Sequence, residues 1–282
     1  MKIGFKTAQA NVDWPTLLAT WELADEMPVF DSGWVWDHFV ALGDDGGASH
    51  EGWTLASALA ARTRRLQLGH LVIGNTYRDP ALLANMAVTL DHVAGGRFVL
   101  GLGAGWHEAE HAMYGWRLPP VGERITMLES AVRVIRALWS SPTGVSLDAP
   151  PYRLVDAVCD PPPLTPSGPP IWLGTQGMRR GLRITAELAD GWNHTGDPAT
   201  FDAKRGALLK HCEAVGRDPA EIEISAQGFL RDGNYAALLE TASGFARSGA
   251  HHLVLLFPAN EGPDGLTRLA AQVAEPLRER FG

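Results

Sequence analysis

An alternation of short apolar strands with amphipathic helices constrains the fold of this 282-residue chain most strongly. The alternation occurs eight times, and the expected strands are residues 2–9, 33–37, 66–73, 97–102, 171–174, 191–195, 221–227 and 252–257. Strands that alternate with helices form a parallel sheet, because each helix carries the chain back to the end where the strand began. The pattern therefore predicts an α/β fold, a single (β/α)8 barrel of the TIM type that forms one domain over residues 1–282.

One segment interrupts this rhythm between the fourth and fifth expected strands. Residues 140–170 contain nine prolines, which exclude a regular helix over most of the segment. Because the alternation resumes directly afterwards, we expect an extended excursion over the surface and not a linker to a second domain. We further expect this excursion, together with the loop at residues 41–51, to shape the pocket for a substrate.

Charge and composition narrow the classes of partner. The formal net charge of −8 argues against nucleic acid, because binding to phosphates requires a basic face. The N-terminal residues lack the apolar run of a signal peptide, and no stretch approaches the ~18 apolar residues of a membrane span. Two cysteines imply no disulfide framework, which favours a reducing compartment. We expect a cytoplasmic protein whose partner is a small molecule, with neither nucleic acid nor membrane involved.

The barrel hypothesis places candidate residues in the loops after the strands, where active sites of this fold lie. The second strand ends in Trp36-Asp37-His38, and an imidazole there could donate or accept a proton near neutral pH. The alternative is a histidine that only binds the backbone. The third strand contains Gly69 and is followed by Gly74. Such glycines indicate a bulge or the close approach of another group to the backbone. The alternative is an ordinary exit from the strand into a loop.

Two glycine-rich loops are candidates for contact with a cofactor. Residues 101–106, Gly-Leu-Gly-Ala-Gly-Trp, resemble a dinucleotide fingerprint but have Trp106 in place of the third glycine. They still provide a loop poor in side chains that could meet an anion or a flat ring. Residues 174–177, Gly-Thr-Gln-Gly, precede a helix that opens with Arg179 and Arg180, which is favourable chemistry for a phosphate unless the arginines are simply solvated.

Residues 107–111, His-Glu-Ala-Glu-His, satisfy the H-E-x-x-H pattern of zinc hydrolases. The helix that carries them must be very short, because Tyr114-Gly115 follows, and no third ligand is evident downstream. We therefore favour a polar, exposed turn of helix over a metal site. The chain also has ten tryptophans, five of them beside strand ends, which suggests an aromatic mouth suited to a flat cofactor.

Taken together, these segments resemble the bacterial luciferase-like superfamily, and within it the deazaflavin (coenzyme F420)-dependent oxidoreductases of actinobacterial type. The resemblance extends over nearly the whole chain. It is carried by residues 36–39, 74–78 with Pro80, 89–91, 95–97, 101–106, 110–111 with 114–115, 138–139, 169–172 and 189–193.

The resemblance implies a set of site residues. His38 would lie near the reactive edge of the cofactor ring as the catalytic proton donor or substrate anchor, and Leu71–Val72 would form a cis-peptide bulge against one ring face. The full set expected to bind the cofactor is Asp37, Leu71, Val72, Asn75, Ala104, Gly105, Trp106, Gly174, Thr175, Gln176, Gly177 and Thr195. The resemblance also implies a homodimer.

The chain departs from the family pattern at three places. The turn after the first helix reads Met27-Pro28-Val29-Phe30, the phosphate loop is less rich in glycine, and Trp106 replaces a glutamate that acts as acid in the sugar-phosphate dehydrogenases. The leading hypothesis is hydride transfer between F420 and a small organic substrate. An FMN-dependent monooxygenase on the same barrel is the alternative, a zinc hydrolase through His107 and His111 is a remote one, and a cofactor-binding protein without turnover is a further one.

Overall fold

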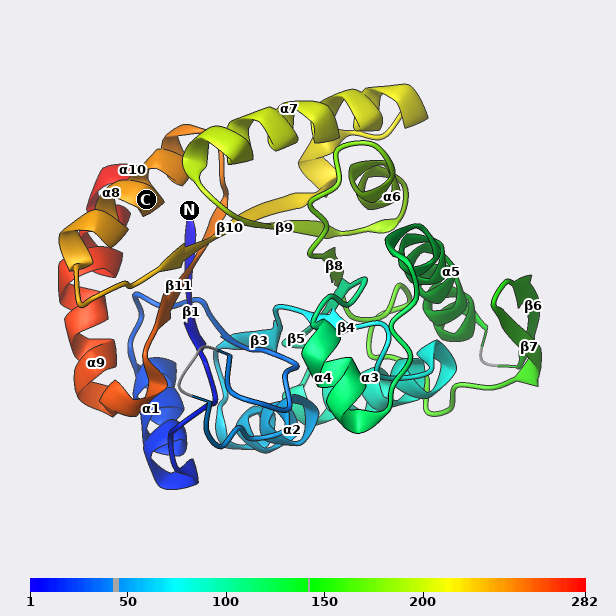
Figure 1. The fold of residues 1–282 in the computed structure, drawn as a ribbon, viewed down its shortest axis with the longest axis horizontal. Helices are drawn as coiled ribbons and strands as arrows, with labels where there is room; N and C mark the ends of the chain where they lie inside the picture. The colour runs from blue at the N-terminus through cyan, green and yellow to red at the C-terminus, as the bar shows by residue number, and fades with distance from the viewer. Residues whose placement is uncertain (43–45, 142) are drawn as a thin grey trace.

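A computed structural model describes residues 1–42, 46–141 and 143–282, and over these ranges eight parallel strands close into a barrel surrounded by helices (Figure 1). The ring runs β3-β2-β1-β11-β10-β9-β8-β5, and pairing of β5 with β3 closes it. Its strands are β1 (Lys2–Thr7), β2 (Ser32–Val35), β3 (Gln67–His70), β5 (Phe98–Gly103), β8 (Ile171–Leu173), β9 (Gly191–Thr195), β10 (Glu223–Phe229) and β11 (His252–Phe257). The predicted (β/α)8 barrel is thus confirmed.

The third expected strand is not continuous. After β3 the Leu71–Val72 peptide bond is cis, as the resemblance implied, and the two-residue strand β4 (Ile73–Gly74) then pairs with the far end of β5. Residues 71 and 72 consequently leave the ladder at the carboxyl end of the barrel. This break positions both side chains to line a cavity there.

The helices pack outside the barrel wall, and their ends follow local sequence rules. In α3, Asp79 caps the N-terminus ahead of Pro80, and Gly95 ends the helix with φ 61°. In α7, Asp197 forms a capping box with Thr200. The helices are α1 (Trp14–Glu26), α2 (Gly52–Arg62), α3 (Pro80–Ala94), α4 (Glu108–Tyr114), α5 (Val121–Ser140), α6 (Arg180–Leu188), α7 (Pro198–Val215), α8 (Tyr235–Arg247), α9 (Gly262–Leu269) and α10 (Glu275–Phe281). Over the described ranges, none of these helices is both long and apolar enough to cross a membrane.

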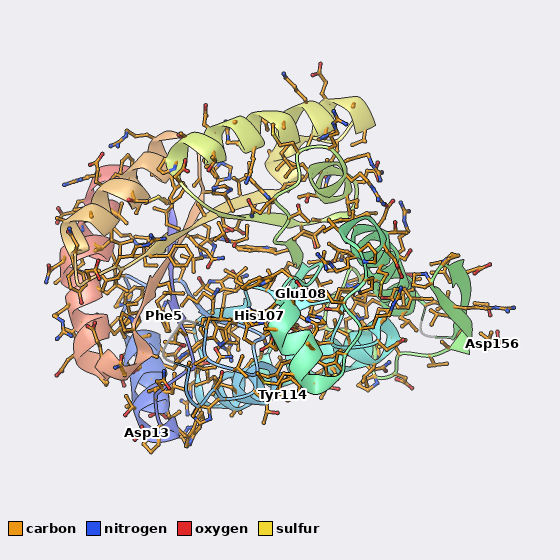
Figure 2. The ribbon with its side chains drawn as sticks, viewed as in Figure 1. Phe5, Asp13, His107, Glu108, Tyr114 and Asp156 are labelled. Atoms are coloured by element: carbon orange, nitrogen blue, oxygen red, sulfur yellow. The ribbon has the colours of Figure 1, made fainter. Side chains whose placement is uncertain are left out.

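The proline-rich excursion contains a hairpin that the sequence did not indicate. Strands β6 (Val145–Ala149) and β7 (Tyr152–Ala157) pair antiparallel and pack on the outside of α5. Figure 2 shows Asp156 of this hairpin at the outer edge of the molecule. The excursion connects the end of α5 to the start of β8, so its two ends lie on the side of the barrel where strands begin.

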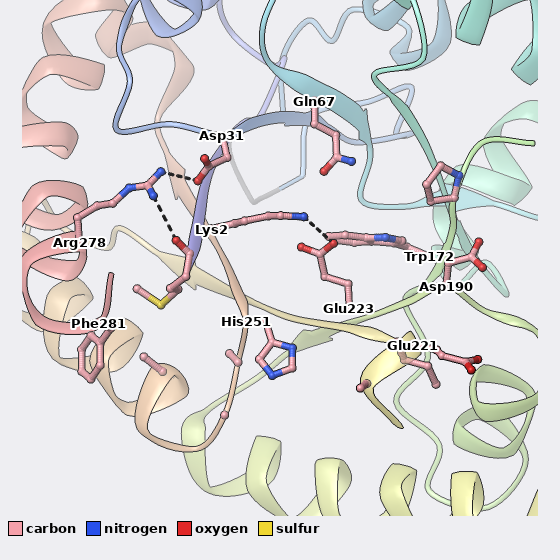
Figure 3. A pocket seen from close by; sticks show the side chains of 17 residues that line it. Lys2, Asp31, Gln67, Trp172, Asp190, Glu221, Glu223, His251, Arg278 and Phe281 are labelled. Carbon is pink, nitrogen blue, oxygen red and sulfur yellow. Dashed lines mark hydrogen bonds and ion pairs between the residues drawn. The ribbon is translucent and has the colours of Figure 1, made fainter. Parts of the chain in front are cut away.

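Ion pairs occupy that amino-terminal side of the barrel. His252 lies between Ser32 Oγ, 2.7 Å away, and the Glu223 carboxylate, 3.0 Å away, and Lys2 also binds Glu223. Figure 3 shows Lys2 reaching Glu223 and Arg278 reaching Asp31 around a cavity of about 800 Å³. These paired charges join the first, second, seventh and eighth barrel strands to the last helix.

Candidate active site

A second cavity, of about 510 Å³, lies at the carboxyl ends of the strands. Of the thirteen site residues expected from the sequence, eleven line it, and Asn75 and Gly177 do not. Lining residues that sequence reasoning missed include Lys6, Tyr77, Asn193 and Gln227. The predicted set is therefore largely brought together in one place, and these four added members supply further polar groups.

His38 is the predicted proton carrier, and its ring is held on one side only. Nδ1 lies 3.0 Å from Glu110 Oε2, and Nε2 is bonded to no protein atom among the described residues. The side chain is 14% exposed. Trp36 packs edge-on against the imidazole, with ring centroids 5.7 Å apart, and its buried Nε1 has no acceptor in the described part of the chain. His38 thus keeps one ring nitrogen available for a ligand.

Glu110, on α4, organises this part of the site. Its Oε1 accepts hydrogen bonds from the backbone N–H groups of Phe39, at 2.6 Å, and Val40, at 3.2 Å, while its Oε2 accepts from the Tyr77 hydroxyl as well as facing His38. Burial opposes ionisation of Glu110, but these hydrogen bonds outweigh it and lower the pKa of the carboxyl. An ionised Glu110 requires the His38 proton on Nδ1, which leaves Nε2 as an acceptor in the neutral ring.

Burial acts in the opposite direction on His38. Removal from water lowers the pKa of its imidazole, although Glu110 partly offsets the effect. The carboxylate of the neighbouring Asp37 accepts two hydrogen bonds from Arg78, at 2.7 and 2.9 Å, and a third from Gly74 N–H. Its burial nevertheless raises the pKa of Asp37 to about 6. Asp37 therefore fixes the loop after β4 and is not free to take part in proton transfer.

Val72 explains several glycines of the motif. A Cβ at Gly103 would lie 2.6 Å from the Val72 side chain, and a Cβ at Gly174 would lie 2.9 Å from it. A Cβ at Gly105, where φ is 78°, would overlap the Thr76 hydroxyl. These positions are glycine because the Val72 and Thr76 side chains occupy the space that a Cβ would need. The glycines are therefore explained by packing, without an anion-binding role for the Gly-Leu-Gly-Ala-Gly-Trp segment.

The loop at residues 174–177 has the features of a phosphate cradle. The N–H groups of Gln176 and Gly177 donate to no acceptor in the described ranges, and both precede the nine-residue helix α6. Lys204 of α7 lies at the loop, with Nζ 2.9 Å from Gln176 Oε1. Of the two arginines, Arg180 binds α5 through Gly122 O and Thr126, and Arg179 is exposed, as in the solvated alternative. Lys204 is a cation at the loop that the sequence did not indicate.

Four expectations need correction. Asn75 donates to Tyr152 of the hairpin, 3.3 Å away, and does not line the cavity. Among the described residues 140–141 and 143–170 none lines it either, because this excursion joins the amino-terminal side of the barrel. From the loop at 41–51, Leu42 lines it, while residues 43–45, like Pro142, lie outside the described ranges. The aromatic mouth is smaller than expected: Trp36 and Trp106 line the cavity, whereas Trp34, Trp172 and Trp192 are buried.

The fourth correction concerns the H-E-x-x-H segment, which is not an exposed polar turn. Glu110 and His111 are buried, and His107 caps α4 by accepting from Glu110 N–H. Figure 2 labels His107 beside α4. Both ring nitrogens of His111 are engaged, one with His107 O at 2.8 Å and one with Thr76 Oγ1 at 2.7 Å. Within the described ranges, no group of three metal-ligating side chains converges. The segment holds α4 against the loops and presents Glu110 to His38.

The amino-acid sequence is similar to a known family and to several characterised proteins. A model of the luciferase-like monooxygenase family matches residues 5–261. An F420-dependent glucose-6-phosphate dehydrogenase of Amycolatopsis mediterranei is 37% identical over 160 residues, which cover 56% of this chain and 47% of the relative. A phthiodiolone/phenolphthiodiolone dimycocerosates ketoreductase of Mycobacterium tuberculosis is 32% identical over 219 residues, with 70% and 56% covered. The chain spans about half the length of these curated relatives.

Two solved structures share the fold over almost the whole chain. An F420-dependent secondary alcohol dehydrogenase in complex with an F420–acetone adduct superposes with a TM-score of 0.85 at 19% identity, covering 96% of this chain and 98% of that one. The coenzyme F420-dependent tetrahydromethanopterin reductase of Methanopyrus kandleri gives a TM-score of 0.78 at 17% identity, covering 100% and 99%.

Proposed function

The chain belongs to the luciferase-like monooxygenase family, and from that premise we propose that it is an F420-dependent oxidoreductase that transfers a hydride between the deazaflavin and a small organic substrate. The names of the relatives support the cofactor, because both the dehydrogenase and the superposed alcohol dehydrogenase depend on F420. The observation that carries the proposal is the geometry of one cavity. It combines a free His38 nitrogen with the Val72 wall and a loop of unused N–H groups.

The residues present fit a flat cofactor with a phosphate. Val72, Ala104 and Gly105 would contact the ring, since glycine and alanine leave that wall without long side chains. The N–H groups of Gln176 and Gly177, with Lys204, would bind the phosphate. When bound, a deazaflavin supplies a carbon that accepts or releases a hydride as a two-electron carrier.

His38 then accepts or donates the proton that is transferred together with the hydride. Neutral His38 accepts the hydroxyl proton of an alcohol at Nε2 during oxidation, and the protonated ring returns it during reduction of a carbonyl. Glu110 stabilises the protonated ring and keeps its orientation in both directions. The Trp36 ring packs edge-on against the imidazole and helps to hold its orientation.

The rest of the lining favours a small, uncharged substrate. Leu42, Ile125, Phe229 and Leu256 are apolar, and Trp106 stands 62% exposed at the cavity. We therefore propose a simple alcohol or carbonyl compound and not a sugar phosphate. Cytoplasmic location and a homodimeric state belong to the same proposal. The alternative is an FMN-dependent monooxygenase, favoured by the family name, because the loop at 174–177 would serve either phosphate.

Equilibrium binding of oxidised F420 and of FMN, each followed by fluorescence quenching, tests the proposal. We expect F420 to bind at least tenfold more tightly than FMN, which corresponds to about 1.4 kcal/mol. The reverse order would replace the proposal by the monooxygenase, and binding of neither would remove both.

A pair of variants tests the phosphate loop separately. Replacement of Lys204 by Ala should weaken F420 binding by about threefold, since a partly exposed charge contributes under ~1 kcal/mol. Lys210→Ala, on the exposed side of the same helix, serves as the control and should leave the Kd unchanged. Equal effects of both changes would show that general charge, not the loop, is responsible.

A further inference from the structure

Lys6 is a buried ammonium that lines the active-site cavity and that the proposed reaction does not yet use. It projects from β1 with 5% of the residue exposed. Its Nζ donates to the backbone oxygen of Leu71, at 2.6 Å, and to Gln227 Oε1, at 3.1 Å. An ammonium has three N–H donors, and the third meets no acceptor within the described part of the chain.

The charge of Lys6 is not balanced by a carboxylate. No described acidic group lies within ion-pair distance of it, and its two acceptors are neutral oxygens. The titratable groups that share its cavity are Asp37, His38 and Tyr77, of which Asp37 is bound by Arg78 and Tyr77 by Glu110. An ammonium in such surroundings is costly to bury. A ligand that brings a negative charge would remove that cost.

Two effects of burial agree with this picture. Desolvation by burial lowers the pKa of Lys6 to about 7. The positive charge on Lys6 also contributes to the lowered pKa of His38, which shows that the two groups influence each other electrostatically. If the only role of Lys6 were to donate hydrogen bonds to Leu71 and Gln227, an uncharged amide at position 6 could donate them without the cost of burying a charge.

We propose that Lys6 binds the anionic form of the cofactor ring, supplying the positive charge that the ring's delocalised negative charge requires. The proposal rests on the proposed function. The hydroxyl group of the deazaflavin ionises to an anion spread over the ring, whereas the oxidised ring of FMN is neutral at pH 7. Lys6 lines the same cavity as Leu71 and Val72, and its Nζ binds the backbone oxygen of Leu71, a residue of the wall expected to contact the ring. Lys6 therefore favours a deazaflavin over a flavin.

Binding of such an anion should be linked to uptake of a proton. An anion next to Lys6 stabilises its charged form and raises its pKa from about 7, so at pH 8 binding converts neutral Lys6 into the ammonium. Reciprocally, Lys6 should keep the hydroxyl of the bound ring ionised at lower pH than in solution. The visible absorption of the deazaflavin reports this ionisation directly, without any turnover.

The test compares Lys6→Met with Lys2→Met, which removes a lysine from the other end of the same strand, where it binds Glu223 outside the cavity. For F420 at pH 6.5 we expect Lys6→Met to raise the Kd at least tenfold and to move the spectral titration of the bound ring to higher pH by at least one unit. At pH 9.5 the difference in Kd should shrink. Lys2→Met should match the wild type in both measurements, and FMN binding should be unaffected by Lys6→Met.

Calorimetry of F420 binding at pH 8 in buffers of different ionisation enthalpy gives an independent readout. The wild type should take up a fraction of a proton that Lys6→Met does not. Lys6→Arg, which keeps a charge, should retain part of the spectral shift, and Lys6→Gln replaces Lys6→Met if the latter does not fold. Kd values within twofold and identical spectral titrations in wild type and Lys6→Met would overturn the inference while leaving the proposed function standing. Absence of F420 binding by the wild type would overturn both.

Discussion

At the scale of single residues, His38 depends on Glu110 for its orientation and its protonation. Glu110→Gln removes the negative charge that partly restores the pKa of His38, so that pKa should fall further below its usual value. We expect the titration of the His38 ring, followed by NMR, to move to lower pH by up to about one unit, and turnover to fall by ~10–100-fold. The Kd for F420 should stay within twofold.

Glu108→Gln is the matched control for this prediction. Glu108 lies on the same helix, is exposed, and forms no side-chain hydrogen bond or ion pair with the described site residues. Its replacement should leave the His38 titration and turnover unchanged. A His38 titration that is the same in both variants would contradict the role assigned to Glu110.

His38 could be predicted from the sequence, and Glu110 and Lys6 could not, for physical reasons. His38 follows a strand directly, which places it at the mouth of a barrel. Glu110 lies 72 positions away, within a pattern that first suggests zinc, and its contact with His38 exists only through the path of the loops. One feature of the sequence could have indicated Lys6. Interior strands of parallel sheets are mostly apolar, so a charged residue within one of them is unusual.

At the scale of elements, the loop formed by Leu71 and Val72 packs against two neighbouring strands. Gly103→Ala places a methyl group where Val72 lies, so we expect a loss of about 1–3 kcal/mol in the free energy of unfolding and weaker F420 binding. Gly122→Ala, at the start of α5 with open space around its Cβ position, should be neutral or slightly stabilising.

Chemical denaturation of both glycine variants measures the difference. Removal of the opposing side chain in Val72→Ala/Gly103→Ala should recover part of the lost stability. If the double variant were as unstable as the sum of the two single changes, Val72 would not be the group that requires a glycine at position 103.

The elements themselves were mostly predictable, since strand and helix periods differ clearly over eight repeats. The break at residues 71–72 could not be predicted from the spacing of apolar residues. A continuous apolar run predicts one strand, whether or not its middle residues are hydrogen-bonded to a neighbouring strand. Only the resemblance to the family suggested it. The hairpin β6–β7 was hidden because its strands are short and surrounded by prolines.

At the scale of the whole molecule, Glu223 of β10 links three neighbouring strands, because it binds His252 of β11 and Lys2 of β1. Burial raises its pKa, but hydrogen bonds from His252 and Lys2 outweigh that effect and lower it from 4.5 to about 2. The stability that this carboxylate contributes is complete above pH 4.5 and is lost as the pH falls towards 2. Glu223→Gln should therefore lower the free energy of unfolding at pH 7 by on the order of 2 kcal/mol and flatten its decline in acid.

Urea titrations between pH 2 and 7 test this expectation, with Glu221→Gln as control. Glu221 is 62% exposed and pairs with Arg217, four positions before it, so its loss should change stability by under ~0.5 kcal/mol. A difference between wild type and Glu223→Gln that persisted unchanged to pH 2 would argue against the charge as its source.

The hairpin offers a second prediction at this scale. Replacement of residues 145–157 by a short glycine-serine linker exposes α5, where Ala149 and Leu154 are now buried, and should lower the midpoint of thermal unfolding by several degrees. Because no described residue of the excursion lines the active-site cavity, the Kd for F420 should stay within twofold. A large loss of F420 binding, with a circular dichroism spectrum that shows an intact fold, would mean that the excursion contributes to the active site.

The packing of Val72 between Gly103 and Gly174 also has an evolutionary consequence. Three positions from three separate segments of the chain share one small volume, so a lineage cannot enlarge any of them alone without displacing the others. Descendants in which position 72 shrinks would gain freedom at 103 and 174, and those that keep a branched residue at 72 would keep both glycines. Divergence of this chain's relatives should therefore leave a three-way correlated substitution pattern at these positions, inherited as a unit.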